Sequence, residues 1–288
     1  MYIMNNEYIK WNYNGETYIL RVETDDLCPE DPRTWDNIAT FACWHRDYKL
    51  GDDIGKVDAD DFFRQLVREN VPYDNIKKEA EAGKLTGIRI EKNNGLYDIY
   101  ETYYYNTAIV DTEPREALEY GEIDGETVVD YIIEDLTIKH CLTLLEPYMY
   151  IVPLWLYDHT QVHIKCGYKY PFTDKWDGGQ VGFAIVRKDD IIKEYGDIDD
   201  WKARAQKIIE AETKTYDYYI SGEVYGYSVF DVKDTDEPID LCWGFYGADI
   251  IENGIIDYVG LGLAEAIKNG DYTIGEIKIY TETKYVYA

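Results

Sequence analysis

The sequence predicts an α+β fold with a mostly antiparallel sheet and a few helices. Two pairs of segments alternate apolar and polar residues around an Asn-Gly turn, which is the typical short-range signal of an antiparallel hairpin. The first turn is Asn14-Gly15 and the second is Asn94-Gly95. Other segments place apolar residues at helical spacing, so the chain is expected to contain both strands and helices.

Helices are predicted where such spacing runs between a capping residue and a stop signal. The expected helices cover 58–70, 200–220 and 257–268. Further strands are predicted from apolar or alternating runs. Beyond the two hairpins, which cover 7–23 and 87–105, the expected strands lie at 138–157, 180–187, 224–232, 239–246 and 274–287.

A short internal sequence similarity bears on domain organisation. Trp35-Asp36 precedes Phe41-Ala42, and Trp176-Asp177 precedes Phe183-Ala184 at nearly the same interval. Two related α/β halves would explain this similarity, and chance explains it equally well. The corresponding domains would be an N-terminal half, 1–140, and a C-terminal half, 141–288.

Charge is the most unusual property of the chain. It has 57 Asp plus Glu residues against 29 Lys plus Arg residues, a formal net charge of −28 in 288 residues. Self-repulsion on this scale destabilises the compact state, so the acidity needs an explanation other than the stability of the fold. One such reason is a surface that imitates a polyanion such as DNA. The alternative is an ordinary cytosolic protein that is merely acidic.

The acids are densest in the segment 111–135, which contains ten of them and one base, Arg115. Interleaved aliphatic residues indicate a folded, acid-faced segment rather than a linker. Three consecutive tyrosines precede it, and tyrosine combines a large rigid contact area with a polar tip. We therefore expect a partner-binding surface made of Tyr103, Tyr104, Tyr105, Asp111, Glu113, Glu116, Glu119, Glu122, Asp124, Glu126 and Asp130.

Several classes of protein are excluded by the sequence. Residues 1–7 lack the basic and apolar regions of a signal peptide, and the longest apolar run, 149–157, contains Pro153 and is too short to cross a bilayer. Five scattered cysteines are typical of a reduced, cytoplasmic protein. No basic patch with interleaved aromatic residues occurs. We expect a cytoplasmic protein that binds neither a membrane nor nucleic acid directly.

One segment groups histidine and cysteine: it contains His159, His163 and Cys166. On a strand, two residues four positions apart are separated by ~13 Å, at ~3.3 Å per residue, which is too far for His159 and His163 to hold one metal ion. His140 and Cys141 would face opposite sides of a strand, so they could not form a nucleophile–base pair. No metal and no cofactor is therefore predicted.

Seven short motifs are distributed along the chain: Asp31–Asn37 (DPRTWDN), Cys43–Arg46 (CWHR), Leu50–Asp52 (LGD), Leu156–His159 (LYDH), Trp176–Phe183 (WDGGQVGF), Val224–Tyr227 (VYGY) and Cys242–Gly247 (CWGFYG). They resemble those of a family of uncharacterised proteins encoded by phages and bacterial mobile elements. The similarity extends from about residue 18 to residue 250. It implies a setting, a small accessory protein acting in a bacterial cytoplasm, and it assigns neither an activity nor catalytic residues to this chain.

The leading functional hypothesis is an anti-defence protein of the anti-CRISPR or antirestriction type. Such a protein would bind a host nucleic-acid-directed effector and occlude or mimic its DNA site, with segment 111–135 in place of phosphates. One alternative is a metal-dependent hydrolase or nucleotide-processing enzyme with Asp158, His159 and Asp177 as site residues. Another is a structural or replication accessory protein of a phage. A second copy of the chain is a further candidate partner.

Overall fold

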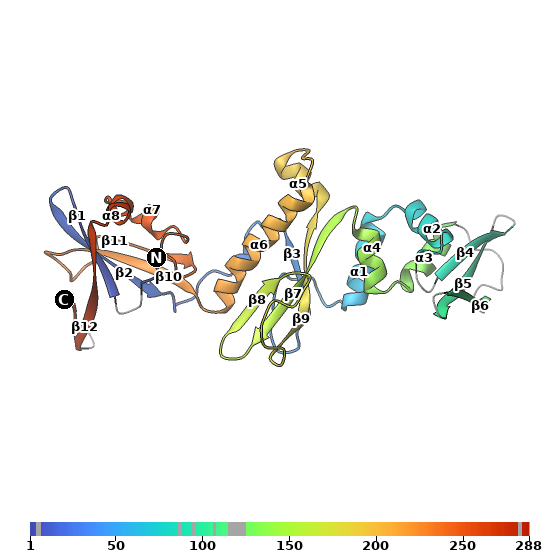
Figure 1. The fold of residues 1–288 in the computed structure, drawn as a ribbon, viewed down its shortest axis with the longest axis horizontal. Coiled ribbons are helices and arrows are strands. Elements are labelled where there is room, and N and C mark those ends of the chain that lie inside the picture. Colours follow the sequence, from blue (N-terminus) through green and yellow to red (C-terminus); the bar gives the residue numbers. More distant parts are fainter. Residues whose placement is uncertain are drawn as a thin grey trace. The chain divides into compact units, whose positions relative to one another are not determined.

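The computed structural model describes residues 1–3, 7–85, 88–93, 96–105, 108–114, 125–281 and 284–287 (Figure 1). The fold is α+β, as predicted. The strands of the described part form sheets of six, four and three strands. The strand pairs whose register is defined in these sheets are antiparallel.

The chain divides into two compact units, and each is assembled from separated segments. The first unit comprises 1–37, 154–180 and 210–288, and the second comprises 38–153 and 181–209. This division differs from the expected halves 1–140 and 141–288, because each of those halves contributes residues to both units.

The first unit contains the six-stranded sheet, whose strand order is β11-β10-β2-β1-β12-β13 (Figure 1). Asn14 and Gly15 have φ values of 52° and 85°, as a two-residue I′ hairpin turn requires, so the first predicted hairpin is confirmed. The strands are β1 (Glu7–Tyr13), β2 (Glu16–Thr24), β10 (Val224–Asp231), β11 (Asp240–Tyr246), β12 (Tyr272–Thr281) and β13 (Lys284–Tyr287).

Two short helices pack on one face of this sheet. They are α7 (Ile255–Val259) and α8 (Leu263–Asn269), and Figure 1 shows them on the same side of the strands. The single helix expected at 257–268 is therefore wrong, since the chain breaks it at Gly260–Gly262. Buried side chains of the sheet and of both helices form one core, which includes Ile9, Trp11, Leu20, Tyr227, Phe245, Ile255, Val259 and Leu263.

The second unit contains the three-stranded sheet and four helices around a separate core. The sheet consists of β4 (Ile88–Asn93), β5 (Leu96–Tyr105) and β6 (Ala108–Pro114), and the pairing of β4 with β5 confirms the second predicted hairpin. The helices are α1 (Ala59–Asn70), α2 (Tyr73–Glu81), α3 (Gly125–Glu134) and α4 (Ile138–Leu145). Asp58 caps α1, as expected from the sequence.

Helix α4 corrects one prediction about strands. Residues 138–145 form a helix, and only the later part of the run 138–157 is a strand, β7 (Met149–Asp158). Thr137 and His140 start the helix with a capping box, in which each side chain bonds to the other residue's backbone. His140 and Cys141 are thus neighbours on a buried helix. Burial raises the pKa of the Cys141 thiol to about 12, so this thiol is not a ready nucleophile.

The four-stranded sheet has the order β3-β9-β7-β8. It places the Phe-Ala pairs of the two similar motifs side by side, because Phe41 pairs with Ala184 and Ala42 pairs with Phe183. The two similar segments therefore form neighbouring strands of one sheet. The remaining elements are β3 (Thr40–Cys43), β8 (Val162–Cys166), β9 (Gly178–Arg187), the 3-10 turn Pro32–Thr34, α5 (Lys188–Tyr195) and α6 (Trp201–Ile220), which matches the longest predicted helix.

Phe63 should be a main stabilising residue of the second core. Its side chain is fully buried, and its ring lies 5.0 Å from the ring of Phe183 in an edge-to-face arrangement. Phe63→Ala should lower the free energy of unfolding by ~3–5 kcal/mol, because it removes buried apolar area and leaves a cavity. Half-buried Phe62 on the same helix is the control, and Phe62→Ala should cost clearly less. Equal losses in urea unfolding would show that the two faces of α1 are wrongly assigned.

Candidate protein-binding surface

The predicted acidic surface is only partly covered by the described residues. Glu116, Glu119, Glu122 and Asp124 lie outside them. The three tyrosines at 103–105 lie on β5, and Asp111 and Glu113 lie on the adjacent strand β6, paired with it in antiparallel register. Glu126 and Asp130 belong to α3, where Asp130 accepts a hydrogen bond of 3.2 Å from the Tyr73 hydroxyl. This binding surface stays a prediction.

The candidate enzyme residues do come together in part. Nδ1 of His159 lies 3.0 Å from Oδ2 of Asp177, and the backbone N–H of Asp158 donates to the carbonyl of Asp177. The His159 side chain is 64% exposed. Among the residues that the structure describes, no group of three His, Cys, Asp or Glu side chains is arranged to hold a metal ion.

His163 is engaged elsewhere, on β8 as expected. Its Nδ1 lies 3.1 Å from Oδ1 of Asp217 on α6, and the same oxygen accepts the backbone N–H of Ile164 at 2.8 Å. Because β8 is the outer strand of the four-stranded sheet, Asp217 occupies one of its edge donors. His159 and His163 therefore have separate partners.

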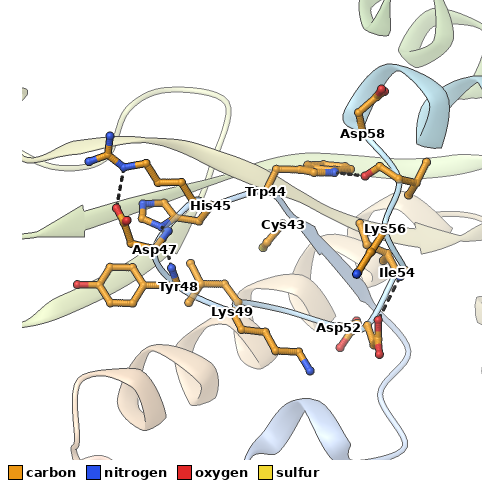
Figure 2. Close-up of a pocket in the computed structure, with 15 residues that line it drawn as sticks. Cys43, Trp44, His45, Asp47, Tyr48, Lys49, Asp52, Ile54, Lys56 and Asp58 are labelled. Atoms are coloured by element: carbon orange, nitrogen blue, oxygen red, sulfur yellow. Dashed lines mark hydrogen bonds and ion pairs between the residues drawn. The ribbon is translucent and has the colours of Figure 1, made fainter.

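The loop between β3 and α1 surrounds a shallow hollow of about 830 Å³ (Figure 2). Trp44 donates its indole N–H to the carbonyl of Val57 at 2.8 Å, and Asp52 accepts the backbone N–H of Phe41 at 2.7 Å. The Nδ1 atom of His45 accepts the backbone N–H groups of Asp47 and Tyr48. These bonds shape the loop, and they occupy the imidazole nitrogen that would otherwise act as a base.

A third arrangement brings motifs from distant parts of the chain together on the sheet of the first unit. Cys242 and Phe245 of β11 join the core beneath α7 and α8, so Leu241 and Trp243 point to the opposite face of the sheet. Gly244, with φ of 88°, is an extra residue in β11 that shifts the register at this point. The shift returns Tyr246 to the same face of the sheet as Trp243.

Aromatic contacts fix this face. The rings of Trp35 and Tyr246 meet edge to face at 5.3 Å, and the Tyr246 hydroxyl donates to the carbonyl of Glu30. The Trp243 ring lies over Gly226, where an added Cβ would come within 2.1 Å of it. Glycine at 226 is therefore required for this position of the indole. The motifs at 31–37, 224–227 and 242–247 thus meet in one place.

We call Trp35, Ile239, Leu241, Trp243 and Tyr246 the β11 face. Ile239, Leu241 and Trp243 are 54%, 53% and 42% exposed, although all three are large apolar side chains. Exposed apolar side chains that gather in one patch are typical of protein-binding surfaces. The sequence showed the alternating run at 239–246, but it did not show that this strand lies at the edge of the sheet.

Acids border the β11 face. The end of β10 and its connection to β11 contain Asp231, Asp234, Asp236 and Glu237, with Lys233 as the single base, and Lys233 forms an ion pair with Glu16. At the other end of the strand, burial and the carboxylates of Glu30, Asp31 and Asp25 raise the pKa of Tyr246 to about 12. The face is therefore apolar in its middle and negatively charged at both ends.

Comparison of the chain with protein-family models, with curated proteins and with solved structures finds no match. The resemblance to phage and mobile-element proteins therefore stays a prediction. In the part of the chain that the structure describes, no helix has both the length and the apolar composition needed to cross a membrane.

The pKa of Tyr246 predicts a pH dependence of stability. The phenol has a pKa of about 12 in the folded protein and about 10 in an unfolded chain. Its contribution is complete below about pH 10 and is lost as the pH rises toward 12, because only the unfolded chain then releases the proton. Urea unfolding should show a steeper loss of stability over this range for the wild type than for Tyr246→Phe. Parallel curves would contradict the assigned environment of this phenol.

Proposed function

We propose that the protein is an anti-defence protein of a phage or mobile element. It binds a host nucleic-acid-directed effector, of the CRISPR or restriction type, in the bacterial cytoplasm and blocks the basic surface that the effector uses for nucleic acid. The observation that carries this proposal is the β11 face, with its exposed aromatic and aliphatic side chains between two groups of acids.

The chemistry of this face matches a nucleic-acid-binding partner. A protein that binds nucleic acid presents lysine and arginine to phosphates, and the same basic groups attract a strongly acidic protein. Apolar anchors such as Trp243 and Leu241 add affinity that does not depend on charge. Binding of this kind combines a charge-driven approach with an apolar contact that slows dissociation.

Several bases of the first unit form ion pairs with acids. In the first unit, Arg33 pairs with Glu212, Lys214 with Glu252 and Lys233 with Glu16. Each of these pairs is neutral as a whole, and over the full chain 57 acids against 29 bases leave a net charge of −28, which produces a negative potential around the molecule. This potential favours a basic partner over DNA, RNA or another acidic protein.

The His159–Asp177 pair supports the alternative of a hydrolytic enzyme. An aspartate that contacts the Nδ1 atom of an exposed histidine is the arrangement that orients a general base. Under the proposed function this pair has no catalytic part. A His159→Ala variant should therefore keep full inhibitory activity, and loss of activity with an unchanged melting temperature would favour the enzyme.

Charge reversal tests the proposal. Asp234→Lys, Asp236→Lys and Glu237→Lys together should weaken protection of phage plating in a host that carries the defence system, because like charges would then face the partner's basic site. Affinity for the effector should fall by about tenfold or more, and the difference should shrink at high salt as the charges are screened.

Two further variants make this test specific. Glu194→Lys, Asp197→Lys and Asp199→Lys change the net charge equally on exposed positions of the second unit, so they show the effect of charge alone. Reversal at Glu116, Glu119, Glu122 and Asp124 tests the predicted acidic segment. Equal losses from all three sets would mean that net charge acts without a defined surface. Full activity of all three sets would contradict the proposed function.

A further inference from the structure

The backbone hydrogen bonds of the six-stranded sheet show which edge groups of β11 are exposed. Val232 donates its N–H to Thr17, and Asp25 donates its N–H to Val224, so the even-numbered residues of β10 bond to β2. The odd-numbered residues of β10 therefore bond to β11. The bond from the Gly247 N–H to the Glu223 carbonyl follows the same pattern.

The register then identifies the residues that point outward. Tyr227 pairs with Cys242, and Val229 pairs with Asp240, so these two residues of β11 direct their N–H and C=O groups toward β10. Leu241 and Trp243 direct theirs away from the sheet. β11 is the outer strand, and no strand of the described residues pairs with its outer side.

The same two residues also carry the exposed apolar side chains. Leu241 and Trp243 lie on the face opposite α7 and α8, and the Trp243 ring is held in place over Gly226. A strand added beside β11 would find backbone donors and acceptors at its edge and apolar contacts on one face. Because the indole is already positioned, binding would cost little side-chain entropy there.

The charges near β11 determine which kind of strand can pair with its outer edge. Asp234, Asp236, Glu237 and Asp240 stand at one end of β11, and Glu30 and Asp31 stand near the other. A second copy of the chain, paired antiparallel at this edge, would bring its own acids against these, so self-pairing is opposed. A segment with lysine or arginine at alternate positions would place opposite charges there.

We propose that β11 binds an extended, basic segment of the partner protein as an additional antiparallel strand. Leu241 and Trp243 supply the backbone hydrogen bonds at the edge, and their side chains supply the apolar contact. This inference rests on the proposed function, since it names the binding mode of a basic partner at the β11 face.

The direct test uses short peptides as probes. An octapeptide of alternating lysine and valine should bind about tenfold more tightly or better than an octapeptide of alternating lysine and glycine with the same charge, because valine favours an extended strand. Hydrogen exchange should slow at the amides of Leu241 and Trp243 when the first peptide is added. A peptide of alternating glutamate and valine should not bind.

Two substitutions at one position separate the backbone from the side chain. Leu241→Pro and Leu241→Ala both remove the leucine side chain, but only proline removes the outward N–H. Leu241→Pro should bind the lysine–valine peptide about tenfold more weakly than Leu241→Ala, with a similar melting temperature. If the proline variant unfolds, slowed exchange at Leu241 and Trp243 in the wild-type protein still decides the question.

The outcomes distinguish this inference from the proposed function. Equal affinity for the two lysine peptides, slowed exchange at other residues, or equal affinity of the two Leu241 variants would overturn strand addition while leaving a basic partner in place. Dimerisation through slowed amides of β11 would show that a second copy occupies the edge. Absence of binding by either lysine peptide at low salt would contradict both the inference and the proposed function.

Discussion

The pairing of β10 between β2 and β11 controls what each face of the six-stranded sheet offers. Its register sends Tyr227, Cys242 and Phe245 into the core beneath α7 and α8 and sends Leu241 and Trp243 to the other side. A shift of one residue would exchange these two sets. The extra residue at Gly244 preserves the arrangement, because it lets Phe245 return to the core after Trp243 has faced outward.

Local signals explain which parts of the fold could be predicted. The hairpin at Asn14-Gly15 and the Asp58 cap depend on a few neighbouring residues, and both are present. The strand prediction over 138–145 was wrong because two helix signals were missed. Ile138, Cys141, Leu142 and Leu145 recur at helical spacing, and Thr137 starts a capping box. The edge position of β11 depends on strand order, which joins segments over 200 residues apart and leaves no local trace.

The candidate site likewise has features that the sequence could predict and features that it could not. The sequence indicated an acidic protein with tyrosine available for recognition, and its motifs at 31–37, 224–227 and 242–247 were visible. It did not indicate that these motifs meet, since the contact of Trp35 with Tyr246 and the position of Trp243 over Gly226 arise only from the folded sheet. The acidic segment 111–135 was conspicuous because composition can be read directly, whereas an exposed edge cannot.

The acidity also opposes self-association through the exposed apolar edge. Outer strands with apolar side chains tend to pair with other copies, and proteins oppose this with charge, proline or bulges. β11 has all three: Pro238 precedes it, Gly244 interrupts it, and acids stand at both ends. Charge of one sign repels a second copy but attracts a basic segment. Under the proposed function, the acids that oppose self-pairing would therefore also select the partner, which would give the net charge of −28 a role in recognition.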